Sequence, residues 1–194
     1  MEGKKILFGF SGSFCNHHKC MAELKKLAEK NDVTVVVSKN VAALSTRFYN
    51  HIEFLNECET ISGHQVIKDI VTAEWVGPKD PFDIMCIAPM SASCTSRLVY
   101  GNYDCPVTLA AKAMIRNRKN VVVAIASNDA LGISGKNIFH LLNYKHIYFV
   151  PLAQDDPIKK PNSLVARFEL LEATMDQALN HQQIQPLLWQ GGNA

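Results

Sequence analysis

Two short segments rich in small and hydroxyl-bearing residues carry the side chains best suited to hold an anion. The first covers residues 9–15 and contains Ser11 and Ser13, and the second covers residues 88–98. Small residues let the backbone approach a phosphate, and the start of a helix offers unpaired N–H groups and a partial positive charge. Either segment alone could be an ordinary capped helix start, but two such turns together point more specifically to a phosphate site.

Known phosphate-binding motifs fit these segments less well. No Gly-Lys-Ser/Thr follows the first segment, so it is not a P-loop, and its glycines lack the G-x-G-x-x-G spacing. The second apolar run of the chain ends in Ser38 and Lys39, where a dinucleotide-binding fold usually carries an acidic residue for the ribose. Lys39 could meet a 2′-phosphate, so an NADP site stays open, while Ser38 suits a further phosphate hydroxyl better.

The elements that must position these segments follow an alternating pattern. Continuous apolar runs rich in valine and isoleucine, typical of parallel strands covered on both faces, lie at residues 6–10, 33–37, 84–88, 121–126 and 147–150. Helical periodicity predicts helices around residues 21–28, 107–116 and 163–179, the last one after a long loop over 151–161. This order predicts an α/β fold: a three-layer, doubly wound, Rossmann or flavodoxin-like parallel sheet with helices on both faces. Ligands of such sheets bind beyond the carboxyl ends of the strands.

Composition limits the class of protein. The 194 residues are 47% hydrophobic and 20% charged, which suits one domain over residues 1–194, with residues 181–194 as a C-terminal tail. A net charge of +2 is too small to indicate a nucleic acid or an anionic membrane as partner. No apolar run reaches the roughly 18 residues of a membrane helix, and the N-terminus lacks a signal-peptide pattern. We therefore expect a cytoplasmic protein whose six cysteines are reduced.

A cluster of potential metal ligands occurs at residues 15–20, which read Cys-Asn-His-His-Lys-Cys. Structural zinc sites take ligand pairs from separated segments, and six adjacent residues that open a helix cannot easily surround a tetrahedral ion. We therefore expect no metal site, and we interpret the cluster as a capped helix start with small thiols.

Segment 9–13, Ser38 and segment 89–94 together resemble the homo-oligomeric flavin-containing cysteine decarboxylase family of FMN-binding proteins. The family's Pro-Ala-Ser-Ala-Asn-Thr motif, which lies along the flavin, reads Pro-Met-Ser-Ala-Ser-Cys at residues 89–94. The resemblance implies FMN as cofactor and a trimer-based homo-oligomer with the flavin near a subunit interface. The cofactor-binding residues that it implies are Gly9, Ser11, Gly12, Ser13, Ser38, Thr46, Pro89, Met90, Ser91, Ala92 and Ser93.

Longer motifs spread over essentially the whole chain resemble the family of dipicolinate synthase B subunits. They lie at residues 45–48, 110–117, 127–132, 154–163 and 183–186. The resemblance implies formation of dipicolinate (pyridine-2,6-dicarboxylate) from an intermediate of the tetrahydrodipicolinate pathway, in the mother-cell cytoplasm of a sporulating bacterium. It also implies a partner, the A subunit of dipicolinate synthase, that carries NAD or NADP.

Two departures from the decarboxylase pattern bear on the activity. Residues 73–83 lack the histidine that the decarboxylases carry ahead of their motif, and Ser93 and Cys94 replace its Asn and Thr. Both departures argue against a stand-alone FMN-dependent decarboxylase. A further alternative is a non-catalytic scaffold subunit with a vestigial flavin site.

A small, flat dicarboxylate needs positive charge and fixed donors, preferably from a bidentate arginine. Arg47 and Arg97 lie beside the predicted pocket segments, and Asn128 offers an amide at the end of a predicted strand. We expect these three residues to bind substrate, and we assign no catalytic residue. The hydrogens lost when the ring becomes aromatic pass either to a bound flavin or to the nicotinamide of the partner.

Overall fold

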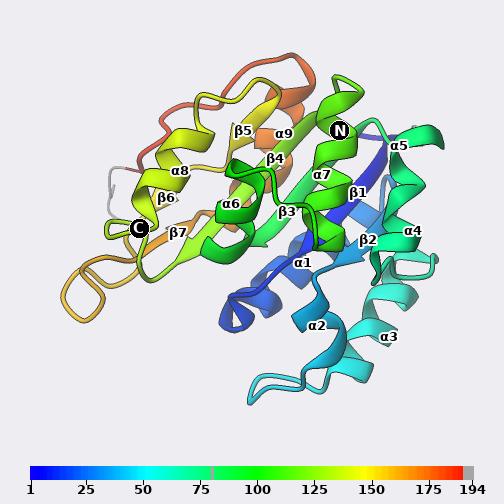
Figure 1. Ribbon diagram of the computed structural model, residues 1–194, viewed down its shortest axis with the longest axis horizontal. Coiled ribbons are helices and arrows are strands. Elements are labelled where there is room, and N and C mark those ends of the chain that lie inside the picture. Colours follow the sequence, from blue (N-terminus) through cyan, green and yellow to red (C-terminus); the bar gives the residue numbers. More distant parts are fainter. Residues whose placement is uncertain (80, 190–194) are drawn as a thin grey trace.

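Four parallel strands form the centre of the sheet in the computed structural model, which describes residues 1–79 and 81–189. In the order in which they pair, they are β2 (Asp32–Val37), β1 (Lys5–Phe10), β3 (Ile84–Met90) and β4 (Asn120–Ser127) (Figure 1). The short strand β5 (Ile147–Phe149) continues the parallel part beyond β4. Every residue of β3 and β4 is buried, which explains why these runs are continuously apolar. The five predicted strands are confirmed.

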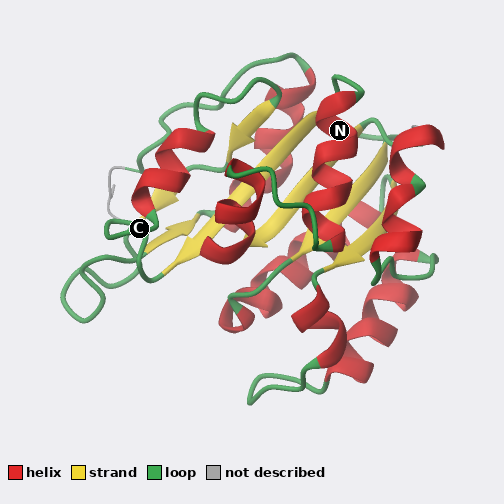
Figure 2. Cartoon of the chain, viewed as in Figure 1, coloured by secondary structure: helices red, strands yellow, loops and turns green. Residues whose placement is uncertain are grey.

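Helices cover both faces of this sheet (Figure 2). The helices α1 (His17–Ala28) and α9 (Leu171–Leu179) contact each other on one face, and α7 (Pro106–Arg116) packs across β2, β3 and β4 on the other. α6 (Ala92–Val99) contacts both α7 and α8 (Gly135–Leu141). Toward the β2 side lie α2 (Lys39–Ala43), α3 (His51–Ser62), α4 (Ile70–Glu74) and α5 (Val76–Lys79). The arrangement is the predicted doubly wound, flavodoxin-like fold.

The predicted helix over residues 163–179 is wrong in its first part. Leu164–Ala166 form a strand, β7, and a 3-10 turn over Phe168–Leu170 separates it from α9, which begins at Leu171. The side chains of β7 alternate between buried and half-buried, as they do in a strand, and only the later residues keep the spacing of a helix. The predicted end of the helix near Asn180 is confirmed.

An open edge of β4 explains this strand. β5 pairs with β4 only at Val121–Val123, so Ala126 and Ser127 are free to pair with β7 in the antiparallel direction. β7 in turn pairs with β6 (Leu152–Ala153), which lies inside the predicted loop 151–161. The sheet, seven strands in the described part of the chain, is therefore mixed rather than wholly parallel.

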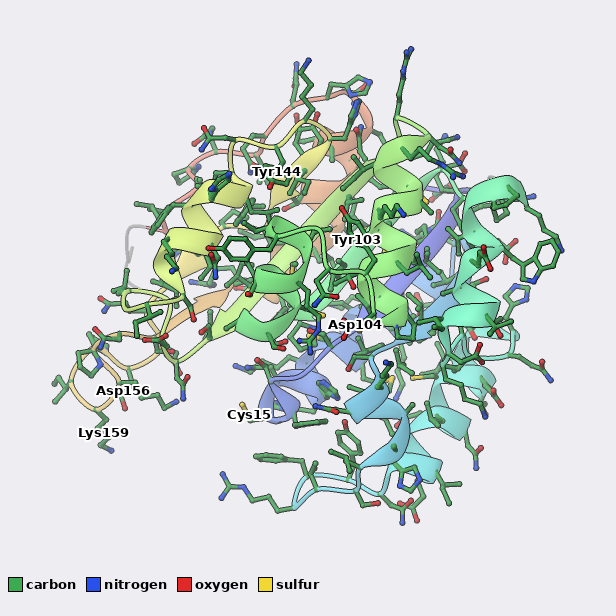
Figure 3. The ribbon with its side chains drawn as sticks, viewed as in Figure 1. Cys15, Tyr103, Asp104, Tyr144, Asp156 and Lys159 are labelled. Carbon is green, nitrogen blue, oxygen red and sulfur yellow. The ribbon has the colours of Figure 1, made fainter. Side chains whose placement is uncertain are left out.

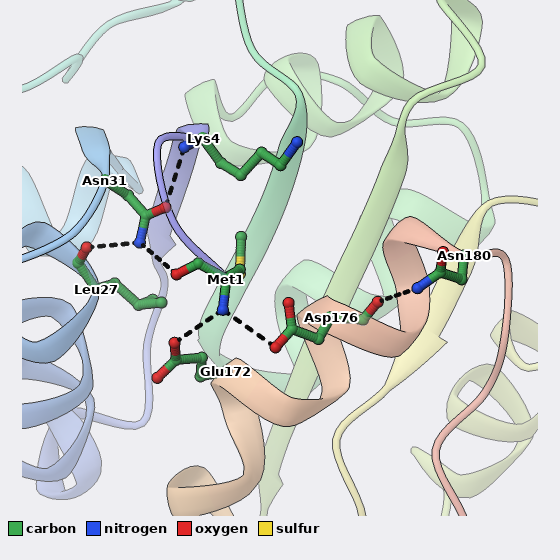
Figure 4. A network of polar contacts seen from close by, with 7 residues as sticks. All are labelled: Met1, Lys4, Leu27, Asn31, Glu172, Asp176 and Asn180. Atoms are coloured by element: carbon green, nitrogen blue, oxygen red, sulfur yellow. Dashed lines mark hydrogen bonds and ion pairs between the residues drawn. The ribbon is translucent and has the colours of Figure 1, made fainter.

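The beginning of the chain is tied to its last helix. The amine of Met1 lies 3.3 Å from Glu172 Oε1 and 3.2 Å from Asp176 Oδ2, both on α9 (Figure 4). The Asn31 side chain accepts from the N–H of Lys4 and donates to a carbonyl in the last turn of α1. These contacts join β1 to the two helices on one face of the sheet.

Residues 181–189 of the predicted C-terminal tail run beside β6. Leu188 pairs with Leu152, and the guanidinium of Arg167 lies 4.6 Å from the ring centre of Trp189. Residues 190–194 of that tail lie outside the described residues. Across the described residues, none of the helices has both the length and the apolar character needed to cross a membrane.

Candidate functional site

The two serine-rich turns meet where the path of the chain through the sheet reverses. β1 lies between β2 and β3, and the chain leaves β1 toward β2 but leaves β3 toward β4. Because the two connections diverge, a crevice opens beyond the carboxyl ends of β1 and β3, the usual ligand position in a doubly wound sheet. Ser11 directly follows β1 and Ser91 directly follows β3, so the predicted segments converge on this crevice.

Ser11 joins the two turns to each other. Its side chain is fully buried, and its hydroxyl donates to the carbonyl of Pro89 at 2.8 Å and accepts from the N–H of Ser91 at 2.9 Å. A hydroxyl that is engaged as both donor and acceptor has little capacity left for a ligand. Ser11 therefore positions the rim of the crevice, and its direct contact with a cofactor stays a prediction.

A pocket of about 250 Å³ lies where α2, α6 and α7 begin. Ser91 is the N-cap of α6, with its hydroxyl accepting from the N–H of Cys94 at 3.4 Å, and Ser38 reaches the pocket from the end of β2. The starts of α6 and α7, the hydroxyls and a cation make a donor set that suits a phosphate. The residues lining this smaller pocket are Gly12, Ser38, Lys39, Asn40, Ser91, Ser93, Cys94, Arg97, Asp104 and Cys105.

Arg97 is a cation held in place at the smaller pocket. Its Nε lies 3.0 Å from Asp104 Oδ1, and its Nη1 donates to the hydroxyl of Ser93 in the first turn of α6. Arg97 and Arg47 were predicted together as substrate ligands, but the two arginines line different pockets. The position of Arg97 favours a phosphate contact, and its substrate contact stays a prediction.

A larger pocket of about 630 Å³ adjoins the smaller one and shares Ser91 and Ser93 with it. Its size suits a flat, ring-bearing ligand. Ser13 helps to form it, because its hydroxyl donates to the carbonyl of Ala126 at 2.6 Å and so links the first turn to the end of β4. The lining residues, which include the predicted pair Arg47 and Asn128, are Ser13, Cys15, Asn16, Arg47, Ser91, Ala92, Ser93, Ala126, Ser127, Asn128, Asp155, Lys160, Ser163 and Val165.

Lys160 is a second cation in the larger pocket, and the predicted site did not include it. Its Nζ lies 2.7 Å from Asp155 Oδ2, so both residues enter the pocket as an ion pair. They come from the connection between β6 and β7, which the sequence showed only as a polar loop. Their neighbours Asp156 and Lys159 lie at the outer end of that loop, away from the body of the molecule (Figure 3).

Other predicted cofactor residues shape the backbone without lining either pocket. Gly9 lies inside β1, and Pro89 and Met90 are buried at the end of β3. Thr46 accepts a hydrogen bond at 3.1 Å from the backbone N–H two residues later, in the loop that presents Arg47. Contacts between these four predicted residues and a cofactor stay predictions.

His17 holds the first serine-rich turn in place through its backbone. It is 2% exposed, and its Nε2 lies 2.7 Å from the carbonyl oxygen of Ser11. Because a carbonyl only accepts, Nε2 carries the ring proton. Burial lowers the pKa of His17 to about 4, which keeps the ring neutral at pH 7. The other residues of the 15–20 cluster diverge: Cys15 faces the larger pocket, and Cys20 is buried in the core.

Comparison with known proteins identifies relatives that cover nearly the whole chain. A family model described as "Flavoprotein" matches residues 1–177. The B subunit of dipicolinate synthase from Bacillus subtilis (strain 168) is 44% identical over 189 residues, which cover 97% of this chain and 94% of that protein.

Solved structures give a similar picture. The crystal structure of the dipicolinate synthase B subunit from Bacillus halodurans superposes with a TM-score of 0.89 and 43% identity, covering 97% of each chain. The FMN complex of DmrB from Burkholderia xenovorans, described as a cubic protein cage for redox transfer, has a TM-score of 0.69 at 12% identity and covers 92% of this chain and 96% of its own. At that identity the second likeness shows the fold alone.

Proposed function

The chain belongs to the flavoprotein family and, within it, to the family of dipicolinate synthase B subunits, and from this premise we propose that it binds FMN across the two pockets and takes part in dipicolinate synthesis. The observation that carries the proposal is the junction of the two pockets at Ser91 and Ser93, beyond the ends of β1 and β3. The smaller pocket offers helix starts and the cation Arg97 to an anionic group, and the larger pocket offers space for a ring. A molecule with a phosphate at one end and a flat ring at the other matches this division.

The smaller pocket would hold the phosphate. Ser38 and Ser93 offer hydroxyls, the start of α6 offers N–H groups, and Arg97 offers a charge already oriented by Asp104. These donors fit a phosphomonoester dianion, which accepts several charge-assisted hydrogen bonds at once. FMN, when bound, would supply a two-electron acceptor beside the substrate.

The larger pocket would orient the substrate. Dipicolinate carries two carboxylates on one flat ring, and Arg47 and Lys160 place two cations around the same cavity. Asn128, at the end of β4, adds an amide, and Asp155 holds Lys160 at the rim. The proposed reaction removes water and two hydrogens from a tetrahydrodipicolinate-pathway intermediate, together with an A subunit that carries NAD or NADP, in the mother-cell cytoplasm of a sporulating bacterium.

Flavin titration tests the proposed cofactor. The purified chain is titrated with FMN and with riboflavin, which lacks the phosphate, and binding is followed by flavin fluorescence. We expect FMN to bind more tightly, and we expect Arg97→Gln to weaken FMN binding about tenfold or more, the size expected for one charge-assisted hydrogen bond, with little effect on riboflavin. Equal binding of both flavins, or of neither, contradicts the phosphate assignment.

Reconstitution with the A subunit tests the proposed activity. Dipicolinate formation is measured with and without added FMN for the wild-type chain, for Arg47→Gln and for the control Lys159→Gln, whose side chain lies outside the pocket. We expect Arg47→Gln to lower kcat/KM about tenfold or more, because a charge-assisted carboxylate contact is lost. Activity that is unchanged in Arg47→Gln and in Ser91→Ala would instead identify the chain as a non-catalytic scaffold.

A further inference from the structure

Two thiols line the smaller pocket among its hydroxyl groups. Cys94 lies in the first turn of α6 and Cys105 is the N-cap of α7, and both belong to the pocket lining. The two side chains lie close enough to influence each other's protonation. They are 3% and 6% exposed, so protein covers them on every side except the pocket.

The surroundings of the pair make the two sulfurs unequal. The neighbouring Cys94 thiol lowers the pKa of Cys105, and the backbone N–H groups of Val107 and Thr108, in the first turn of α7, act in the same direction. The pKa of Cys94 is raised, because the Cys105 sulfur is its neighbour and because it is buried. Negative charge therefore collects on Cys105, which becomes the nucleophile of the pair.

The other four cysteines lack this combination of features. Cys20, Cys58 and Cys86 are buried in the core, where burial raises the pKa of each thiol. Cys15 is exposed in the larger pocket. Of the described cysteines that line the smaller or the larger pocket, only Cys94 and Cys105 are two thiols that interact with each other.

We propose that Cys94 and Cys105 form a reactive dithiol that a hydroperoxide converts to a disulfide, and that this disulfide and a phosphate-bearing ligand exclude each other from the smaller pocket. The second half of the proposal rests on the proposed function, which makes FMN that ligand. A ligand in the pocket covers the only open side of the thiols. A disulfide, in turn, holds the two sulfurs about 2 Å apart and so draws the first turn of α6 toward the start of α7.

The oxidation is a two-electron step in two stages. The Cys105 thiolate attacks the terminal oxygen of the hydroperoxide, the O–O bond breaks, and the alkoxide or hydroxide that leaves takes up a proton, while Cys105 becomes a sulfenic acid. The Cys94 sulfur then attacks the Cys105 sulfur, the S–O bond breaks, and the oxygen leaves as water with the Cys94 proton. Overall, the two thiols lose two electrons and two protons, and the peroxide becomes an alcohol (or water) plus water. A small dithiol reverses the reaction by exchange.

Peptide mapping tests the disulfide directly. The reduced full-length chain is treated with an equimolar amount of hydrogen peroxide, the remaining thiols are blocked with iodoacetamide, and the tryptic peptides are analysed by mass spectrometry. We expect a cross-link between peptides 80–97 and 98–112, with fragmentation assigning it to Cys94 rather than Cys86. The cross-link should be absent in Cys94→Ser and Cys105→Ser and should persist in the control Cys15→Ser. Modification of Cys15 alone, or over-oxidation of Cys105 without a cross-link, would overturn the proposal.

Flavin binding to the same wild-type samples tests the exclusion, so no result depends on whether a serine variant folds. We expect FMN added before the peroxide to suppress the cross-link. We also expect the oxidised chain to show no binding at FMN concentrations that saturate the reduced chain, and dithiothreitol to restore binding. FMN binding that is equal in the oxidised and reduced chains would disprove the exclusion. A reduced chain that binds no FMN would contradict the proposed function instead. The cross-link alone would then test whether Cys94 and Cys105 form a reactive dithiol.

Discussion

The buried His17 links the first serine turn to the aromatic side chains below it. Its ring packs against Phe10, Tyr49 and Phe54, with ring-centre distances of 5.5, 5.3 and 5.1 Å, while Nε2 holds the carbonyl of Ser11. The same carbonyl belongs to the residue whose hydroxyl ties the two rims of the crevice together. At the scale of single residues, the shape of the site therefore depends on an imidazole that stays neutral.

We expect this histidine to make stability fall in mild acid. The unfolded chain takes up the proton at the ordinary pKa of 6.5 and the folded chain only near 4, so protonation favours unfolding below about pH 6.5. The stabilisation is complete above pH 6.5 and is lost as the pH falls toward 4. Between pH 7 and pH 4.5, the wild-type chain should lose about 2 kcal/mol more unfolding free energy than His17→Gln does.

Urea unfolding at both pH values measures this difference. The exposed neighbour His18 provides the control, because His18→Gln should keep the full wild-type pH dependence. An identical pH dependence in the wild-type chain and in His17→Gln would show that His17 is not the responsible group.

At the scale of elements, close packing between β1 and α7 sets the floor of the crevice. A Cβ atom added at Gly9 would lie 3.3 Å from the carbonyl oxygen of Cys86 on β3 and 3.3 Å from Cγ1 of Val107 on α7. Both neighbours are fixed, one as backbone of the next strand and the other as a fully buried side chain. The glycine therefore allows the start of α7, and with it the wall of the smaller pocket, to approach the sheet.

We expect Gly9→Ala to lower the free energy of unfolding by about 1 to 3 kcal/mol, because the added methyl group overpacks this contact. Gly77→Ala is the matched control. The nearest atom to a Cβ there is the mobile guanidinium end of Arg116, and the position is helical, so this change should be neutral or stabilising by up to about 1 kcal/mol. Denaturant titration compares the two variants, and equal stabilities would contradict the packing argument.

At the scale of the whole molecule, three large apolar side chains remain exposed between β4 and the end of α8. Leu131, Ile133 and Phe139 are 47%, 79% and 44% exposed, and they follow Asn128 on the way into and along α8. In the trimer-based assembly expected from the sequence, which remains a prediction, a neighbouring copy of the chain would cover these side chains.

We expect light scattering coupled to gel filtration to give a multiple of the 21.6 kDa chain mass. Ile133→Asp should shift the distribution toward smaller species, because it places a charge where the assembly would bury an exposed apolar side chain. Ile158→Asp is the control, since Ile158 is an exposed apolar residue (91%) in a different segment, the connection between β6 and β7. A wild-type chain that elutes as a monomer would contradict the assembly.

Local patterns in the sequence were sufficient to predict much of the fold and the sheet edge at which the two serine-rich turns meet. Continuous apolar runs marked the parallel strands because burial on both faces selects apolar side chains at every position. The serine-rich turns could be recognised from the sequence because each connects the carboxyl end of a parallel strand directly to the start of the next helix. Segments 9–15 and 88–98 could therefore be assigned to one sheet edge from the order of residues alone.

Tertiary structure alone decided which side chains share a pocket. The strand at 164–166 had no distinct local signal and formed because the edge of β4 at Ala126 and Ser127 was free to pair. That pairing brings Lys160 to the same cavity as Arg47, while Arg97 is held in the other pocket by Asp104. Packing of α6 against α7 likewise brings Cys94 and Cys105 into one pocket. Contacts between residues distant in sequence depend on strand pairing and helix packing, which no local pattern of residue types records.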